Sequence, residues 1–333
     1  MDVSATAWWI TVGVTVGVLA VDVFIIGRRP HEPSMRECAI AIGFFTALAL
    51  LFGMWVWVQY GGTYGGQFFA GWLTEYSLSV DNLFVFLIIM SRFGVPRHLQ
   101  QEALLIGIIL ALVFRGVFIA IGAVAIQQIS WIFYIFGAFL VYTAISLVRH
   151  GQDDESDYKE NGVIRWVQKH LPATDEYTGV KLTVKEQGKR VITPMLIVMV
   201  ALGSTDVLFA LDSIPAIYGL TREPYLVFTA NVFALMGLRQ LYFLLGGLLK
   251  RLVYLSLGLS VILAFIGVKL VLTALHENEL PFINGGEHVP VPEIPTLLSL
   301  VVIILTLVVT AAASIVKARR DPSAVRQVDA PPL

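Results

Sequence analysis

The chain has 333 residues, of which 57% are hydrophobic and only 14% charged, and its mean hydropathy is +0.77. This composition excludes a soluble globular protein and indicates a chain that crosses a lipid bilayer repeatedly. The formal net charge is −1, and no basic face is concentrated enough to hold a phosphate backbone. Nucleic acid is therefore excluded as a partner.

Apolar segments long enough to cross a bilayer as helices divide the chain into about nine spans. We expect an all-α, polytopic membrane helix bundle. The first segment lacks the basic start and the cleavage site of a signal peptide, so it is predicted to stay as a helix. The fourth and fifth are joined by the short AIQQIS and are expected to form a tight antiparallel pair. The predicted spans are 7–26, 39–58, 68–91, 103–124, 129–148, 192–214, 225–248, 253–274 and 296–316.

Lysine and arginine residues are concentrated in every second connection between the predicted spans. They gather in the loops near residues 28–36, 92–97, 149–190 and 250–251 and in the tail from Lys317. Because cytoplasmic loops carry an excess of these residues, the N-terminus is predicted to lie outside and the C-terminus in the cytoplasm. The loop at 149–190 is expected to combine a charged linker, GQDDESDYKE, with a short amphipathic helix, VIRWVQKHLP.

An acidic motif occurs twice. The third span reads Glu75-YSLSV-Asp81-Asn82, and the sixth reads Asp206-VLFAL-Asp212-Ser213. In each half the next span carries a central arginine, Arg115 or Arg239, and the third spans match at GAFLVYTA (137–144) and LAFIGVKL (263–270).

Each repeated unit thus spans three helices, and because three is odd the second unit must be inverted relative to the first. The predicted organisation is an N-terminal two-helix segment, a first repeat, a cytoplasmic loop, a second repeat, and finally an outer loop with the last helix and tail. These parts cover residues 1–66, 67–148, 149–190, 191–274 and 275–333.

Ionisable side chains inside a span are costly and need a functional or structural reason. Four motif acids face three cations, Arg115, Arg239 and Lys269, which makes a nearly charge-balanced site. The arginines either join helices structurally or act in gating. Lys269 either belongs to the site or extends to the membrane surface. Asp22, near the end of the first span, reads more readily as an interfacial residue.

Six residues along a helix correspond to about 9 Å of rise and about 120° of rotation. The two acids of one motif therefore cannot bind one ion from a regular helix. Two arrangements remain. Inverted helices that cross at the motif centres place Glu75 level with Asp212 and Asp81 level with Asp206. Alternatively, the helices unwind at SVDN and LDSIP, where Pro215 ends the regular helix.

The candidate ligands are hard oxygen donors, which suit Mg²⁺, Ca²⁺ or Mn²⁺ and do not distinguish among them. Besides the acids they include Ser79, Thr205 and Asn231. The chain has one cysteine, Cys38, so neither a disulfide within the chain nor a thiolate cluster is available. The sequence thus predicts an intramembrane pathway for a hard divalent cation.

The stretches EYSLSVDNLFVF (75–86), STDVLFALDSIPA (204–216) and AFIGVKL resemble the TerC family of bacterial integral membrane proteins over about residues 1–316. The resemblance implies membership of a superfamily of LysE-like inverted-repeat exporters, a location in the bacterial plasma membrane, and a role in tellurium resistance or manganese efflux. Asp22 also fits the family pattern. The family's acidic positions fall on Glu75, Asp81, Asn82, Asp206, Asp212 and Ser213.

We therefore expect a transporter that exports Mn²⁺ by alternating access, with the four acids binding the ion or exchanging it for protons. No enzymatic activity and no permanently bound cofactor are expected. The alternative is a non-transporting scaffold for secretion or stress-response membrane proteins, including partners in metal stress, tellurite resistance or the metallation of secreted enzymes. The sequence contains no recognition pattern for an organic solute. It also lacks the Gly-x-Gly-Asp motif of intramembrane aspartyl proteases.

Overall fold

The protein is a helical bundle, as the composition predicted. The computed structural model describes residues 1, 3–28, 34–128, 131–150, 174, 176–186, 189–245, 253–278, 280–281 and 283–321. The helices are α1 (Ala5–Arg28), α2 (Met35–Tyr60), α3 (Gly62–Arg92), α4 (Arg97–Gln128), α5 (Ile132–His150), α7 (Pro194–Tyr218), α8 (Pro224–Leu235), α9 (Leu238–Leu245), α10 (Leu255–His276) and α11 (Thr296–Arg320), with a 3-10 turn at Asn284–Gly286.

Within these ranges, eight helical segments are long and apolar enough to cross a membrane. The described part of α1 adds a shorter apolar stretch, Ala5–Val18, which agrees with the predicted count of about nine. The strands β1 (Thr183–Glu186) and β2 (Lys189–Ile192) form one antiparallel hairpin, with Thr183 opposite Ile192. The predicted linker and amphipathic helix of the 149–190 loop lie largely outside the described residues.

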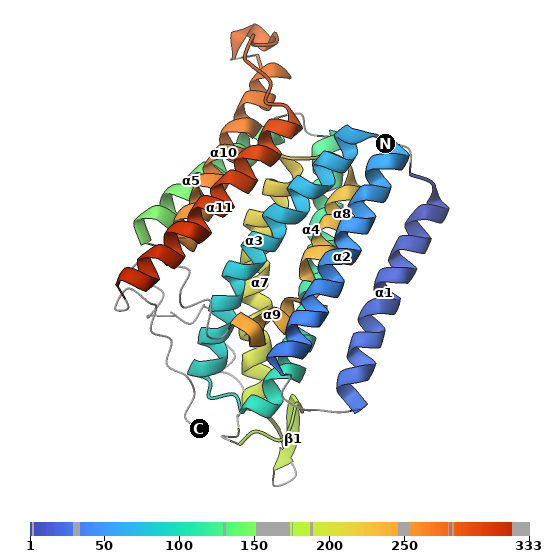
Figure 1. Ribbon diagram of the computed structural model, residues 1–333, viewed down its shortest axis with the longest axis vertical. Helices are drawn as coiled ribbons and strands as arrows, with labels where there is room; N and C mark the ends of the chain where they lie inside the picture. The colour runs from blue at the N-terminus through green and yellow to red at the C-terminus, as the bar shows by residue number, and fades with distance from the viewer. Residues whose placement is uncertain are drawn as a thin grey trace.

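The bundle has a core of four helices, α3, α4, α7 and α8, with further helices on both sides (Figure 1). On one side α10 packs against α5 and α11, and α11 also contacts α3. On the other side α2 packs against α3 and α9, and α1 lies beyond α2 at the edge. We call the end that carries the segment 277–295 the loop end and the end that carries β1–β2 the hairpin end.

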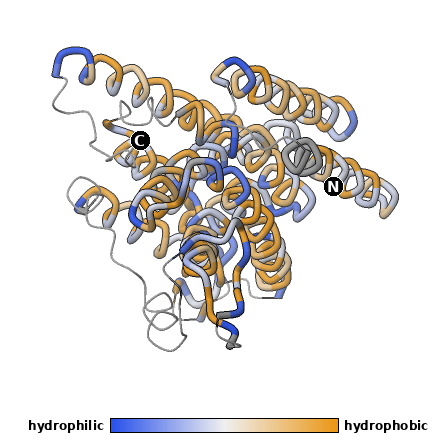
Figure 2. The backbone as a smooth tube through the Cα atoms, turned by 90° about the horizontal axis from the view of Figure 1, so that it is seen from below, coloured by the Kyte–Doolittle hydropathy of each residue, from blue (hydrophilic) through white to orange (hydrophobic). Residues whose placement is uncertain are grey.

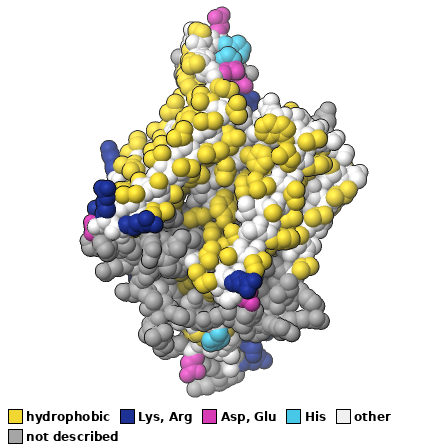
Figure 3. All heavy atoms as spheres, viewed as in Figure 1, with side chains coloured by type: hydrophobic (Ala, Val, Ile, Leu, Met, Phe, Trp, Pro, Cys, Tyr) yellow, Lys and Arg dark blue, Asp and Glu magenta, His cyan; other side chains and the backbone are white. Residues whose placement is uncertain are grey.

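Apolar residues run along most of the helices, and hydrophilic residues are concentrated near their ends (Figure 2). The face in Figure 3 is largely covered by hydrophobic side chains, with charged side chains toward the loop end and the lower part of the molecule. Such a surface can be buried in lipid, because helices satisfy their backbone hydrogen bonds internally.

Contacts between the two halves are reciprocal. The first helix of each predicted repeat packs on the second helix of the other, as α3 with α8 and α4 with α7. The third helices, α5 and α10, pack on each other. At their crossing a methyl group added to Gly137 would lie 2.6 Å from Val271 Cγ2, and one added to Gly267 would lie 2.9 Å from Val141 Cγ2.

A pseudo-two-fold axis between inverted units would produce these reciprocal helix contacts. It pairs Gly137 with Gly267, whereas the sequence alignment had paired Gly137 with Leu263. The residue boundaries given for the two units stay a prediction.

Two expectations about the helices were wrong. The fourth and fifth spans do not form a tight pair, because α5 packs chiefly on α10 and α4 packs on α7 and α8. The seventh span is not one helix. It breaks between α8 and α9 at Met236, which is extended (ψ 129°), and Gly237, whose φ is +81°. A glycine there allows a conformation that L side chains rarely adopt.

Candidate functional site

An ion-pair cluster in the bundle core joins three helices. Arg115 of α4 is buried, with a relative exposure of 1%, and forms an ion pair through Nη1 with Oε1 of Glu75 on α3. Its Nη2 also donates to Oδ1 of Asp206 on α7 at 3.2 Å, and its Nε lies 3.5 Å from Asp206 Oδ2. With both carboxylates ionised, the cluster carries one more negative than positive charge.

Neutral polar groups lie on α3 and α7, which carry the cluster, and on the neighbouring helix α8. Ser79 follows Glu75 by one helical turn, and Ser213 and Asn231 lie on α7 and α8. All three side chains are at least 98% buried, and the Ser79 and Ser213 hydroxyls and both amide atoms of Asn231 lack a hydrogen-bond partner among the described residues. Each such buried group costs about 1–3 kcal/mol, so a set of them calls for an explanation.

The two acids of the second motif face different helices. Asp206 faces Arg115 on α4, whereas Asp212 is half-buried and accepts a hydrogen bond from Thr143 Oγ1 on α5 at 3.3 Å. This divergence agrees with the rotation expected for six residues along one helix. Thr143 was not singled out in the sequence, where a lone threonine in an apolar span carries no signal.

Both arrangements predicted for the motifs were wrong. Glu75 is not level with Asp212, because Arg115 joins it to Asp206. Neither motif helix unwinds: α3 runs unbroken to Arg92, and α7 continues through Pro215 to Tyr218. The break lies one span later, beside Arg239, where Met236–Gly237 supplies the non-helical backbone.

The other predicted site residues divide into two groups. Asn82, Thr205 and Arg239 are buried, with relative exposures of 7%, 7% and 9%. Asp81 lies on α3 and Asp22 on α1, but their side chains lie outside the described residues. Across the described part of the chain, no group of three or more His, Cys, Asp or Glu side chains gathers as a metal-binding set.

The two expected roles of Lys269, in the site or at the membrane surface, stay predictions. Lys269 is 8% exposed, and its Nζ donates to Ser299 Oγ of α11 at 3.1 Å. It lines a separate cavity at the loop end.

Along α3, Gly71 lies between Gln67 in the cavity wall and Glu75 in the ion-pair cluster. Gly71 lies one helical turn before Glu75 on α3, toward the loop end, and a methyl group added there would be 3.4 Å from Ala230 Cβ and 3.5 Å from Ile217 Cγ2. These distances correspond to ordinary van der Waals contact, so α3, α7 and α8 approach one another closely here and still leave room for a methyl group.

Comparison with known proteins identifies relatives along almost the whole chain. An uncharacterized membrane protein of Mycobacterium tuberculosis (strain ATCC 25618 / H37Rv) is 49% identical over 323 residues, which are 96% of this chain and 81% of that protein. An uncharacterized membrane protein of Myxococcus xanthus is 34% identical over 324 residues, or 97% of this chain and 96% of that one.

A third relative, from Escherichia coli (strain K12), is named "Putative membrane-bound redox modulator Alx" and is 39% identical over 264 residues, or 77% of this chain and 82% of that protein. No solved structure matches the chain. The family described as "Integral membrane protein TerC family" matches residues 60–322, which include both acidic motifs, both arginines and Lys269. The chain is therefore a multi-pass integral membrane protein that belongs to the TerC family.

Proposed function

We propose that this protein is a transporter that exports a hard divalent cation, with Mn²⁺ as the favoured substrate. The observation that carries the proposal is the Glu75–Arg115–Asp206 cluster, which is buried in the core and joins both halves of the chain. Buried charges in a membrane span are costly unless they serve a function, and an excess of carboxylate over guanidinium attracts a cation.

The ligand chemistry supports a hard cation. The cluster supplies carboxylate oxygens, and Ser79, Ser213 and Asn231 provide oxygens without partners among the described residues. Such donors suit Mn²⁺, Mg²⁺ or Ca²⁺, whereas softer ions prefer imidazole or thiolate. The preference for Mn²⁺ within this group comes from the family resemblance.

Arg115 supports an exchange mechanism. A guanidinium that holds both carboxylates keeps the charges paired when no substrate is bound, and an arriving cation competes with it for the same oxygens. The Met236–Gly237 break offers a hinge within α8–α9. Alternating access with movement at that break fits these features, and the carboxylates could exchange the ion for protons.

The direction of export rests on the predicted orientation, with the N-terminus outside and the C-terminus in the cytoplasm. Arg92, Arg97, Lys181 and Arg190 all lie at or near the hairpin end, and α11 ends with Lys317, Arg319 and Arg320. Cytoplasmic segments are enriched in these residues, which favours the hairpin end as the cytoplasmic side.

The test is Mn²⁺ flux in proteoliposomes that hold the full-length protein and a fluorescent reporter of the ion. Asp206→Asn and Asp81→Asn remove a charge with little change in shape, and we expect each to lower flux by about tenfold or more, since a charged hydrogen-bonding group is worth about 1.5–3 kcal/mol. Glu287→Gln, at an exposed position in the loop-end segment, is the matched control and should keep wild-type flux. Equal flux in wild type and folded Asp206→Asn would overturn the site assignment.

Two further measurements separate the remaining possibilities. Counterflow without any pH dependence would exclude proton exchange. A scaffold would show a different pattern in cells: Asp81→Asn and Asp212→Asn would leave metal sensitivity unchanged, while deletion of residues 151–173 would abolish the function. The redox role named for some relatives cannot involve a disulfide within this chain, because Cys38 is its only cysteine.

A further inference from the structure

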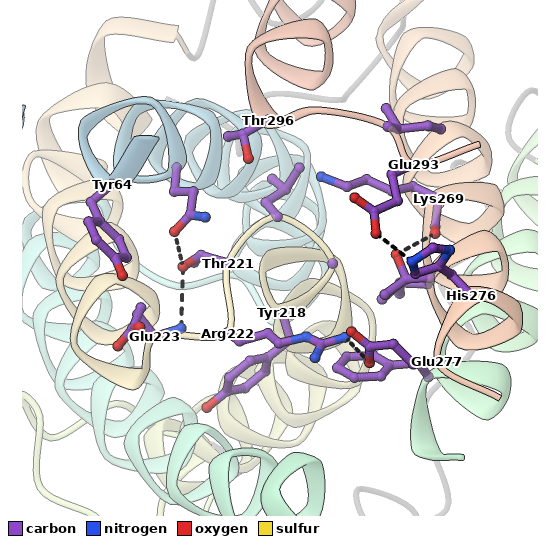
Figure 4. Close-up of a pocket in the computed structure, with 17 residues that line it drawn as sticks. Tyr64, Tyr218, Thr221, Arg222, Glu223, Lys269, His276, Glu277, Glu293 and Thr296 are labelled. Carbon is purple, nitrogen blue, oxygen red and sulfur yellow. Dashed lines mark hydrogen bonds and ion pairs between the residues drawn. The ribbon is translucent and has the colours of Figure 1, made fainter. Parts of the chain in front are cut away.

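A polar cavity of about 350 Å³ opens at the loop end, apart from the ion-pair cluster. Five parts of the chain form its walls: the start of α3, the start of α5, the turn between α7 and α8, the second half of α10, and the segment leading into α11 (Figure 4). Along α3, its residue Gln67 lies two helical turns, or about 12 Å, before Glu75.

Each acidic side chain in the cavity wall already has a basic partner. Glu223 accepts from the amino group of Met1 at 2.8 Å, and Glu277 accepts from Arg222 Nη2 at 2.6 Å. Glu293 Oε1 lies 2.8 Å from His276 Nε2, and this contact is an ion pair only when the histidine is protonated. Each of the three carboxylates thus contacts a basic group other than Lys269.

Lys269 is the basic residue of the wall that remains unmatched. Among the described residues no carboxylate lies within ion-pair distance of its Nζ, whose hydrogen bond goes to the neutral Ser299 hydroxyl. Figure 4 shows the side chain reaching from α10 across the opening, toward the side on which Thr296 lies. The residue is 92% buried, and a buried charge without a counter-charge is strongly destabilising.

A second hydrogen-bond donor lines the same cavity. The Gln67 side-chain oxygen accepts from Thr221 Oγ1 at 2.8 Å, so its amide NH₂ remains as the donor. An ammonium group and an amide NH₂ in one cavity form a donor set for an anion. The unmatched charge is a single one, and carboxylates stand around it, which disfavours a ligand with two or more negative charges.

We propose that Lys269 and Gln67 form a binding site for a small monovalent anion of the chloride type in the loop-end cavity. This site is distinct from the ion-pair cluster and does not depend on the proposed transport of a cation. The anion balances the Lys269 ammonium inside the bundle and receives hydrogen bonds from Lys269 and from the Gln67 amide.

The experiment uses the full-length protein in nanodiscs of zwitterionic lipid, in gluconate buffer with a chelator so that no divalent metal is present. Chloride is titrated, and binding is followed by the linewidth of ³⁵Cl NMR and by the thermal unfolding midpoint. We expect saturable binding that bromide competes for and sulfate does not. Lys269→Met should weaken it by about tenfold or more and Gln67→Leu by a few fold, as expected for charged and neutral hydrogen bonds respectively.

Two variants keep the proposal falsifiable. Lys269→Arg retains the charge and should retain binding, which gives a second measurement if Lys269→Met does not fold. Lys181→Met removes an exposed lysine near the hairpin end and should bind chloride as the wild type does. The proposal is overturned if wild type shows no saturable binding, if Lys269→Met and Lys181→Met bind equally well, or if sulfate binds more tightly than chloride. Since no metal is present, none of these outcomes depends on cation transport.

Discussion

The two halves of the chain carry an arginine at corresponding places in sequence, but on different backbones. Arg115 lies on α4, a helix that runs unbroken from Arg97 to Gln128. Arg239 lies just after the break at Met236–Gly237, on the short helix α9. In the half with the unbroken helix α4, Arg115 contacts acids from both halves. In the other half, a non-helical link precedes the buried Arg239. Under the proposed transport function, the half with Arg115 would bind the ion and the half with Arg239 would move.

The largest expected effect concerns Arg115 on the unbroken helix α4. Arg115→Met leaves Glu75 and Asp206 buried without their guanidinium, and removing one partner from a buried ion pair costs about 3–5 kcal/mol. We expect a corresponding fall in the free energy of unfolding, measured by chemical denaturation in detergent. Combining Arg115→Met with Glu75→Gln and Asp206→Asn should recover much of the loss, because the uncompensated charges disappear. A loss below about 1 kcal/mol in Arg115→Met alone would show that the ion-pair cluster is not structural.

The next effect concerns the contact that joins the halves at α5 and α10. A methyl group at Gly137 would lie 2.9 Å from the carbonyl oxygen of Gly267, and one at Gly267 would lie 3.0 Å from that of Gly137. Gly137→Ala and Gly267→Ala should each lower stability by about 1–3 kcal/mol, because backbone cannot move aside cheaply. Gly71→Ala is the matched control, since its nearest neighbours are side chains at 3.4 Å or more, and it should change the unfolding midpoint little.

Similar losses in the two glycine variants would support the reciprocal packing of the halves. A large loss in one and none in the other would contradict it, because a pseudo-two-fold axis makes the two positions equivalent.

The sequence was sufficient for the features that depend on local composition. Apolar length located the spans, and acids inside them, such as Glu75 and Asp206, stood out because charge in a span is costly. It was insufficient for features set by how helices rotate and cross. Spacing could not show that Arg115 joins Glu75 to Asp206, nor that α5 packs on α10 and not on α4. A short loop fixes which helices follow each other along the chain, but not which surfaces bury one another.

The break before Arg239 illustrates a different limit. Pro215 was the stronger sequence signal for an interruption, yet α7 continues past it to Tyr218. A proline removes one backbone hydrogen bond, and neighbouring helices and the last turn can accommodate that loss in a membrane protein. Gly237, among 28 glycines in the chain, gave no signal that set it apart from the packing glycines. Its positive φ became evident only from the folded backbone.

A smaller effect is expected when the glycines near the two arginines, Gly237 and Gly116, are replaced by alanine. Gly237 has a φ of +81°, and an added methyl group would lie 3.0 Å from Phe45 Cδ2. Gly237→Ala should therefore cost about 1–2 kcal/mol and slow any movement at the break. Gly116, next to Arg115, has no atom within 4 Å of an added methyl group, so Gly116→Ala should be neutral or stabilising by about 0.5–1 kcal/mol. Equal effects of the two substitutions on stability and flux would remove the distinction between the halves.

The smallest expected effect concerns the contact that holds the start of α8 at the loop end. Glu223 immediately precedes α8 and accepts a hydrogen bond from the Met1 amino group, which also donates to the Tyr64 hydroxyl. These contacts raise the pKa of that amine from 8.0 to about 10. The folded pKa is above the unfolded one, so this contact contributes its full stability below about pH 8. The contribution falls as the pH rises through about 10. Glu223 is partly exposed, with a relative side-chain exposure of 28%, and solvent screening keeps the effect small.

Glu223→Gln should consequently lower the thermal midpoint slightly at pH 7 and not at pH 11, while Glu287→Gln should show no such dependence. A difference that persists undiminished at pH 11 would mean that Glu223 stabilises the start of α8 by some contact other than the amine. The start of α8 would then be held without the N-terminal amine. Removing the first residues of the chain should in that case leave flux unaltered.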